Sequence, residues 1–442
     1  MKKNTALLLI LFVSLINCTL DANNEEGLEN YIESRAIELK SSSDLAPLID
    51  AAGEANLVLL GEASHGTYEY YIWRDSISRR LIEEKGYNFI AVEGDWASLF
   101  ELNKYVKNLP GAAENAEYVL WNLDRWPTWM WGNREIIGLA EWLREYNDGL
   151  PDEEKVGFYG MDVYDEWRSK KMVLELLEKH FEQLYNQVRI KYNCISPYKP
   201  DSWLYARSVA AGNPNCKDEF AGVVELLSES RDMLNVSDYD YFYLLQNAYV
   251  VKNAEKFYRK SVVSRDASSW NSRVTHMHET VERLLDYYGE GAKGIVWAHN
   301  THIGDAQYTE MRNWGQVNIG QLSRSKHGAN NVLLIGFGTY KGSVKAGSEW
   351  EGRMRRMVIP NAAPDSHEEI LSKVSFDSYF LHFNQADRNH DELMAPRGNR
   401  AVGVVYNPRN DHQQNYVNTI LPLRYDAFIF FQETNALNSL RP

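Results

Sequence analysis

The segment from Gly61 to Gly66 carries the densest group of chemically useful side chains in the sequence. Glu62 and His65 stand three residues apart in it, and the two glycines permit a tight backbone, so both side chains can face the same space. A neutral imidazole can take a proton from water near neutral pH, and a nearby carboxylate can orient the ring and stabilise the imidazolium. The segment is therefore a candidate for general-base catalysis. A glycine turn with a capping serine and an incidental surface histidine is the alternative that the segment alone leaves open.

A second pair of histidines, His299 and His302, is also spaced three residues apart. Such a pair could bind a metal ion, exchange protons or polarise a carbonyl oxygen. The segment lacks the glutamate of the H-E-x-x-H zinc proteases, and zinc would need a further ligand from Glu62 or Glu93. A metal-dependent hydrolase is therefore the weaker interpretation, and we expect no metal.

The choice of nucleophile is narrowed by motifs that the sequence does not contain. There is no G-x-S-x-G elbow, which disfavours a serine hydrolase of the α/β-hydrolase kind. There is also no Walker loop and no G-x-G-x-x-G after a predicted strand. Direct attack by water remains, with His65 or His299 as the base.

Arginine and tryptophan side chains accompany these histidines. Arg74 lies near the start of a predicted helix, from which it can reach back toward one of the two glutamates, although an ordinary salt bridge is the alternative. Trp126, Trp129 and Trp131 lie in one loop before an amphipathic helix. They either pack on the core or form the wall of an apolar substrate pocket.

These residues follow short apolar runs that predict buried strands. Such runs cover residues 57–62, 89–93, 156–162, 294–299, 331–337, 378–383, 401–406 and 427–431. Helical spacing over residues 70–85 predicts a parallel crossover between the first two strands, which places their ends side by side. Ligands bind beyond the carboxyl ends of parallel strands. Glu62, Glu93, Asp162 and His299 should therefore project into one crevice.

The pattern predicts an α/β fold with a mostly parallel central sheet flanked by helices, a large helical insertion and a small α+β subdomain. The catalytic core would comprise residues 31–165, 291–340 and 401–442. The helical insertion would cover residues 166–290, and the subdomain residues 341–400.

The beginning of the sequence is typical of an exported protein. Two lysines precede an apolar run over residues 6–16, which is too short to be a stable membrane span, so residues 1–17 are predicted to be a signal peptide. Cys18 stands where a lipoprotein signal peptidase would cleave and a diacylglyceryl group would attach, and residues 18–30 read as a flexible tether. Asn17 is larger than the usual residue before such a cysteine, so plain secretion is the alternative. We expect lipid anchoring to a membrane on its periplasmic or cell-surface side.

Composition excludes one class of partner and suggests another. The net charge of −14 opposes binding to a phosphate backbone, so nucleic acid is not an expected partner. The 13 tryptophans and 27 tyrosines suit a cleft for a large, partly apolar small molecule. Cys194 and Cys216 could pair in an oxidising compartment, and two cysteines at this spacing are not a zinc signature.

Taken together, these segments resemble the erythromycin esterase family over nearly the whole length that follows the signal peptide. The resemblance rests on Gly61–Gly66 with Arg74, Val92-Glu93, Trp126–Trp131, Gly160–Asp162, Trp270-Asn271 with Arg273 and Met277, Ala298–His302, Val404–Tyr406 and Asp426–Phe428. Ser64 stands where many members have threonine, which keeps the hydroxyl.

This resemblance implies a carboxylic ester hydrolase that opens a macrolide lactone without a cofactor. It implies that His65 is the general base, that Glu62 and Glu93 orient and charge the site, that Arg74 fixes these carboxylates, and that His299 steadies the carbonyl oxygen. It also assigns substrate binding to a further set of residues: His302, Asp162, Trp126, Trp129, Trp131 and Arg273. The antibiotic-inactivating members are cytoplasmic, so the predicted export departs from the family pattern.

A non-enzymatic lipoprotein that binds haem or another hydrophobic ligand is the competing class, since the chain has histidines and aromatic residues enough to hold one. Haem binding would give a Soret band, and hydrolysis would give a ring-opened product.

Overall fold

The computed structural model describes residues 27–264 and 266–441. The predicted signal peptide, most of the predicted tether and Cys18 lie outside these residues. Residues 27–30, at the end of the predicted tether, already belong to a helix over residues 27–35. No helix in the described ranges is long and apolar enough to cross a membrane.

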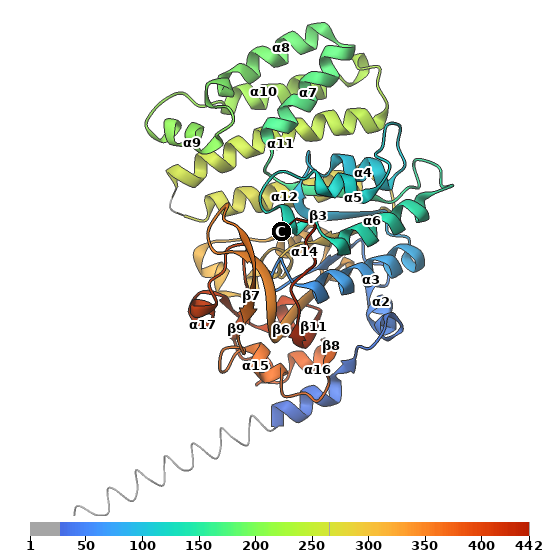
Figure 1. Ribbon diagram of the computed structural model, residues 1–442, viewed down its shortest axis with the longest axis vertical. Helices are drawn as coiled ribbons and strands as arrows, with labels where there is room; N and C mark the ends of the chain where they lie inside the picture. The colour runs from blue at the N-terminus through green and yellow to red at the C-terminus, as the bar shows by residue number, and fades with distance from the viewer. Residues whose placement is uncertain (1–26, 265, 442) are drawn as a thin grey trace, which may run out of the picture.

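A nine-stranded sheet forms the centre of the molecule (Figure 1). Its strands are β1 (Ile37–Glu38), β2 (Leu57–Leu60), β3 (Phe89–Asp95), β4 (Gly157–Asp162), β5 (Gly294–Trp297), β6 (Val332–Gly347), β7 (Met354–Ile359), β8 (Ser378–His382) and β11 (Ala427–Thr434). The order is β1-β8-β11-β6-β2-β5-β3-β4, and β7 pairs with the far half of β6. The stretch from β11 to β4 is parallel throughout, whereas β1, β7 and β8 pair antiparallel. The predicted α/β class with a mostly parallel sheet is thus confirmed.

Helices lie on both faces of this sheet and beyond it (Figure 1). Those in the first part of the chain are α2 (Ala46–Ala52), α3 (Tyr68–Lys85), α4 (Phe100–Val106), α5 (Ala116–Trp121) and α6 (Arg134–Asn147). Those in the middle are α7 (Glu166–His180), α8 (Glu182–Tyr192), α9 (Ser202–Ala210), α10 (Lys217–Glu229), α11 (Asp238–Val263) and α12 (Ser268–Tyr288). The later ones are α13 (Asn300–Ile303), α14 (Ile319–His327), α15 (His367–Leu371), α16 (Gln385–Arg388), α17 (Asp411–Gln414) and α18 (Leu421–Arg424). A separate two-stranded sheet pairs β9 (Arg397–Arg400) with β10 (Tyr416–Thr419).

The period of two in a strand divides the core into two layers. In β2, Val58 and Leu60 pack into one apolar cluster with α3 and α6, whereas Leu57 and Leu59 pack into another with α12. Because both faces are covered, the strand reads as a continuous apolar run.

Helices α7 to α10 extend away from the sheet, at the end of the molecule opposite residues 27–35 (Figure 1). Together with α11 they enclose an apolar core of their own, which includes Val173, Tyr192 and Phe220. A disulfide bond joins Cys194 to Cys216 in this part, with a Cα–Cα distance of 5.9 Å. Helix α12 lies within the predicted insertion but packs directly on the sheet through Val274 and Met277. The division of the chain into core, insertion and subdomain remains a prediction.

Two sequence expectations about the strands are wrong. The ends of β2 and β3 are not adjacent, because β5 pairs with both and lies between them. The run at residues 401–406 forms no strand, only single bridges from Val402 to Ser64 and from Val405 to Gly347. This segment pairs with the loop after β2 at one residue and with the end of β6 at another, so no continuous hydrogen-bond ladder forms.

The segment after β2 is held tightly by its neighbours. A Cβ atom at Gly61 would lie 2.1 Å from the side-chain oxygen of Asn300, and one at Gly66 would lie 2.1 Å from the Lys345 carbonyl of β6. The Asn300 N–H also donates to the Glu62 carbonyl at 2.9 Å. Both glycines are therefore required by the close approach of neighbouring atoms, a side chain at Gly61 and a backbone at Gly66, and this packing fixes the loop that carries Glu62 and His65.

Candidate active site

A cavity of about 430 Å³ opens at the carboxyl ends of the parallel strands. Its polar lining includes His65 after β2, Glu93 on β3, Asp162 on β4, and His299 and His302 after β5. The lining also includes Asp95, Arg125, Trp131, Tyr164, Trp270, Arg273, Trp314 and Trp350. The sequence prediction of one crevice at these strand ends therefore agrees with the structure. Glu62 lies behind His65 and does not itself line the cavity.

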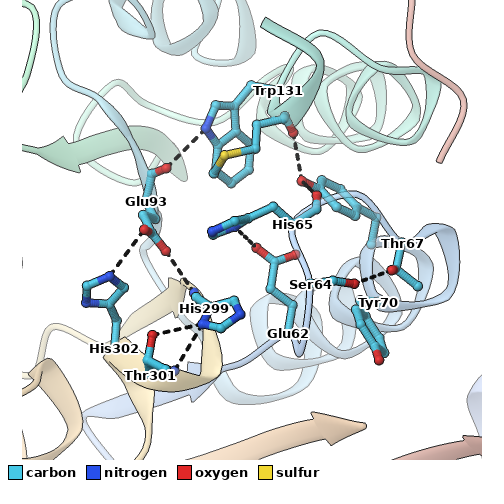
Figure 2. A network of polar contacts seen from close by, with 12 residues as sticks. Glu62, Ser64, His65, Thr67, Tyr70, Glu93, Trp131, His299, Thr301 and His302 are labelled. Atoms are coloured by element: carbon cyan, nitrogen blue, oxygen red, sulfur yellow. Dashed lines mark hydrogen bonds and ion pairs between the residues drawn. The ribbon is translucent and has the colours of Figure 1, made fainter. Parts of the chain in front are cut away.

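His65 is bound from behind by a buried ion pair. Its Nδ1 lies 2.8 Å from Glu62 Oε1 (Figure 2). The Arg74 guanidinium donates to Glu62 Oε2 at 2.7 Å. The Arg74 guanidinium lies over the rings of Tyr71 and Trp297, at 4.6 and 4.7 Å. Because a carboxylate can only accept, the Nδ1 atom of His65 carries the proton. The unprotonated Nε2 of the neutral ring is then the free base.

His299 is held in the opposite tautomer. Its Nδ1 accepts the Thr301 backbone N–H at 3.3 Å and lies 2.8 Å from the Thr301 hydroxyl (Figure 2). The proton of the neutral ring is therefore on Nε2, a buried atom that lies near the Ala63 backbone and makes no hydrogen bond of normal geometry in the part of the chain that the structure describes. Burial and the neighbouring His65 hold the pKa of His299 well below its usual value. His299 is thus a neutral hydrogen-bond donor at neutral pH.

The two imidazoles lie next to each other, with ring centroids 5.0 Å apart and planes inclined by 44°. His65 offers a lone pair and His299 offers an N–H, and both residues line the same cavity. A base and an oxyanion donor must flank a reacting carbonyl in this way for hydrolysis by water.

Glu93 connects the other groups of the site. Its Oε1 atom accepts from Arg273 at 2.8 Å and lies 3.3 Å from His302 Nε2, while Oε2 accepts the His299 backbone N–H at 2.8 Å. Burial opposes the charge of Glu93, but His302, His65 and Arg273 outweigh it and hold its pKa well below the usual value. Glu93 therefore stays a carboxylate and places a negative charge beside His65.

The pKa of His65 follows from these neighbours. Burial lowers it, but the charge of Glu93 and the hydrogen bond and charge of Glu62 raise it more, so the pKa of His65 lies above its usual 6.5. A raised pKa makes the ring a stronger base for the proton of water.

Arg273 of α12 joins two carboxylates. It donates to Asp162 from Nε at 2.8 Å and from a terminal nitrogen at 2.6 Å, in addition to its contact with Glu93. Behind Asp162, the Nδ1 of His276 lies 3.0 Å from the Asn253 amide nitrogen, so its Nε2 donates to the Asp162 carbonyl at 3.1 Å. Asp162 therefore fixes the guanidinium of Arg273, and Arg273 in turn fixes the carboxylate of Glu93.

The tryptophans of the predicted wall divide into two groups. Trp131 lines the cavity and donates to the Glu93 carbonyl at 3.2 Å. Trp129 is 2% exposed and packs in the core, and Trp126 lies behind Trp350, with ring centroids 4.7 Å apart. Neither of these two lines the cavity, so substrate contact by Trp126 and Trp129 is not borne out by the structure.

Other aromatic side chains, remote in the sequence, take that place. The ring of Trp270 stacks on His302 with centroids 4.5 Å apart, while Trp314 and Trp350 line the rim and are 58% and 53% exposed. Trp270 belongs to one of the sequence segments that carry the family resemblance. No local sequence signal marks Trp314 or Trp350.

Sequence reasoning also missed a charged pair at the far end of the cavity. Arg125 donates to both oxygens of Asp95 at 3.1 and 2.9 Å, and its guanidinium lies over the Tyr164 ring at 4.3 Å. Burial raises the pKa of Asp95 to about 6, although Arg125 opposes the shift. Arg125 is adjacent to the tryptophan loop and Asp95 to the Glu93 strand, but neither pattern distinguishes them from surface charges.

No group of three or more His, Cys, Asp or Glu side chains is arranged to hold a metal ion in residues 27–264 and 266–441.

Comparisons with known proteins agree with this fold. The chain is similar to the erythromycin esterase type II of Escherichia coli, with 27% identity over 141 residues, which span 30% of this chain and 31% of that protein. Among solved structures, a succinoglycan biosynthesis protein superposes with a TM-score of 0.76 at 22% identity, covering 94% of this chain and 98% of the other. A Bacillus cereus protein gives 0.77 at 21% identity, covering 94% and 99%. An erythromycin esterase mutant in its open conformation gives 0.67 at 15% identity, covering 92% and 99%.

These structural likenesses show the fold. The sequence model of the family described as erythromycin esterase matches residues 82–434, which include Glu93, Asp162, Arg273, His299 and His302. The segment with Glu62, His65 and Arg74 precedes the matched residues, and the structure brings it against them. The chain belongs to the erythromycin esterase family.

Proposed function

We propose that the protein is a carboxylic ester hydrolase that opens an ester or lactone bond by attack of water activated by His65. The observation that carries this proposal is the pair of opposite tautomers. His65, with a free lone pair on Nε2, and His299, with its proton on Nε2, both line one cavity, and their rings lie 5.0 Å apart.

In the first step, His65 Nε2 takes a proton from water as the water oxygen bonds to the carbonyl carbon. Glu62 accepts the Nδ1 proton in a hydrogen bond and stabilises the imidazolium, and Arg74 holds Glu62 in place. General-base catalysis of this kind contributes ~10²–10⁴-fold.

The carbonyl oxygen becomes an oxyanion in the same step. His299 Nε2–H is the donor placed to receive it, and the low pKa of His299 keeps the ring from protonating at neutral pH. The tetrahedral intermediate then breaks its bond to the leaving oxygen, which takes the proton back from His65. The products are a carboxylic acid and an alcohol, in one molecule if the substrate is a lactone.

A serine nucleophile is disfavoured by the position of the nearest hydroxyl. Ser64 is 1% exposed, does not line the cavity, and hydrogen-bonds to the Thr67 hydroxyl. Its oxygen is therefore turned away from the space where an ester would lie.

Membership of the family and the aromatic wall support a large, partly apolar substrate, and we propose a macrolide such as erythromycin. Trp131, Trp270, Trp314 and Trp350 supply rings on several sides of the cavity. Aromatic side chains contribute large apolar contact areas at low entropic cost, which suits a rigid macrocycle.

The test is incubation of the protein with a panel of macrolides and simple esters, followed by mass spectrometry. A product heavier by one water supports the proposal, and an unchanged panel contradicts it. Chelator treatment and haem titration in parallel address the two competing classes. Activity that survives the chelator excludes a required metal, and a Soret band without hydrolysis would favour a haem-binding protein.

We further propose that the chain is exported and lipid-anchored through Cys18. This rests on the two lysines, the apolar run and the cysteine alone.

A further inference from the structure

A second cavity, of about 470 Å³, lies between helices α10, α11 and α12, apart from the catalytic histidines. Five of its lining side chains are cationic and two are anionic. The cations are Lys217, Lys252, Lys256, Arg259 and Lys260, and the anions are Glu255 and Glu279. The whole chain has a net charge of −14, so its composition does not predict a cavity lined mainly by positive charges.

The four lysines of this cavity make no close ion pair with a carboxylate of the described chain. Glu255 is occupied by Arg259, which donates to both of its oxygens at 2.7 and 3.1 Å, and by the Tyr205 hydroxyl at 2.7 Å. Glu279 lies 3.7 Å from Arg283. Across the described ranges, no carboxylate lies within 4.0 Å of the ammonium nitrogen of Lys217, Lys252, Lys256 or Lys260. Helices α10 and α11 thus bring four lysine charges together, and none of the four has an ion-pair partner in the described chain.

Lys252 shows the cost of this arrangement. It is partly buried, and burial, Arg283 and Lys256 together lower its pKa although Glu279 raises it. An anion bound between these cations would offset their mutual repulsion, and this attraction would contribute to the free energy of binding.

The geometry around the cavity is fixed. Lys217 is the first residue of α10, a helix of 13 residues whose N-cap, Cys216, makes no side-chain cap hydrogen bond. The disulfide holds Cys216, and its backbone N–H donates to the Tyr205 hydroxyl, which in turn donates to Glu255 of α11. The partial positive charge of the helix end adds to the lysines. Asp218 and Glu219 follow in the same turn but do not line the cavity.

The floor of the cavity is polar and already ordered. Asn253 and His276 line it, are 7% and 1% exposed, and lie 3.0 Å apart through Asn253 Nδ2 and His276 Nδ1. Helix α12 is the wall between the two cavities, since His276 lines the second one and Arg273 lines the first.

We propose that the cavity between α10, α11 and α12 binds a soluble small molecule through a phosphate group. Lysine ammonium groups are compact point charges, and several converging on one hollow match the dense charge of a phosphate. The hollow can hold more than the phosphate itself. Of the three helices around the cavity, α10 and α11 lie in the part of the molecule away from residues 27–35, and α12 lies between them and the sheet (Figure 1). A free phosphate compound therefore fits this position better than a lipid headgroup of the membrane to which Cys18 would attach the chain.

The test is calorimetric titration of the full chain with pyrophosphate at low ionic strength, which needs no knowledge of the hydrolysed substrate. The proposal expects one saturable site, weakened about tenfold by Lys252→Gln and by Lys256→Gln, since one charge-assisted hydrogen bond is lost in each. Lys179→Gln is the matched control, because Lys179 is an exposed lysine of α7 outside the cavity. It should bind pyrophosphate as the unaltered chain does.

The contrary results are distinct. Absence of saturable binding, or an equal loss in Lys179→Gln, overturns the proposal, because binding would then reflect general charge. A parallel arm uses vesicles of anionic phospholipid. Vesicle binding that depends on Lys252 and Lys256, without binding of free pyrophosphate, would overturn the assignment to a soluble ligand. Thermal unfolding of each variant shows that the fold is retained.

Discussion

The rings of His65 and His299 lie 5.0 Å apart at the ends of neighbouring parallel strands, and their hydrogen bonds fix them in opposite tautomers. Glu62 holds the proton on Nδ1 of His65, whereas Thr301 leaves it on Nε2 of His299. One ring can accept a proton while the other donates a hydrogen bond. The division of roles in the proposed hydrolysis follows from this difference.

His299→Ala should lower kcat by about 10²–10³-fold with a small effect on KM. The reason is that the lost N–H acts on the oxyanion of the transition state, and one such donor is worth ~3–4 kcal/mol. Steady-state kinetics on any ester that the protein hydrolyses would measure this. A mild loss confined to KM would assign His299 to substrate positioning instead.

The pH dependence of kcat/KM should show a rising limb with an apparent pKa above 6.5, because His65 must be unprotonated to act and its pKa is raised. Glu93→Gln removes the largest charge that raises this pKa, so the limb should move to lower pH. Asp95→Asn is a suitable control, because Asp95 lines the same cavity but does not set the pKa of His65. If the rising limb of the Glu93→Gln variant keeps its pKa, the group that titrates in kcat/KM is not His65.

The disulfide between Cys194 and Cys216 should stabilise the helical part of the molecule without affecting catalysis. The bond closes a loop with a sequence separation of 22. In the chain-entropy description, a disulfide that closes a loop of this length raises the free energy of unfolding by about 3 kcal/mol. The double variant Cys194→Ser/Cys216→Ser should therefore unfold at lower temperature while keeping its kcat. A lost kcat at temperatures where the variant is folded would show that the bond also supports the active site.

Cys18→Ala tests the proposed anchor. If Cys18 carries acyl chains, the variant should leave the membrane fraction for the soluble periplasmic or extracellular fraction with unchanged specific activity. Fractionation and intact mass measure both properties. Continued pelleting of the variant with membranes, or an unaltered chain in the cytoplasm that begins at Met1, would contradict the export proposal.

The central strands could be predicted from the sequence because each is covered on both faces and reads as an apolar run. Their order could not. Helical spacing over residues 70–85 correctly indicates a crossover between β2 and β3, but nothing local shows that β5, from far along the chain, inserts between them. The inserted strand places His299 between Glu62 and Glu93.

The site shows the same limit. Glu62, His65, Glu93, Asp162, His299 and His302 follow or end strands, so their convergence could be predicted from chain direction alone. Trp129 could not be told from a cavity residue, because a buried tryptophan and a substrate-binding one have the same sequence signature. Of the two glutamates that Arg74 is predicted to fix, it pairs with Glu62 and not with Glu93, which is held by Arg273 of α12. Such pairings depend on tertiary packing, which no spacing rule supplies.

The most direct test of water activation by His65 compares the unaltered chain with His65→Ala on the same ester or lactone. The unaltered chain should give a product heavier by one water, and His65→Ala should slow this conversion by several orders of magnitude while still binding the substrate and unfolding at a similar temperature. In water labelled with heavy oxygen, the product carboxylate should carry the label. A folded His65→Ala variant that hydrolyses the substrate at a near-normal rate would contradict the account.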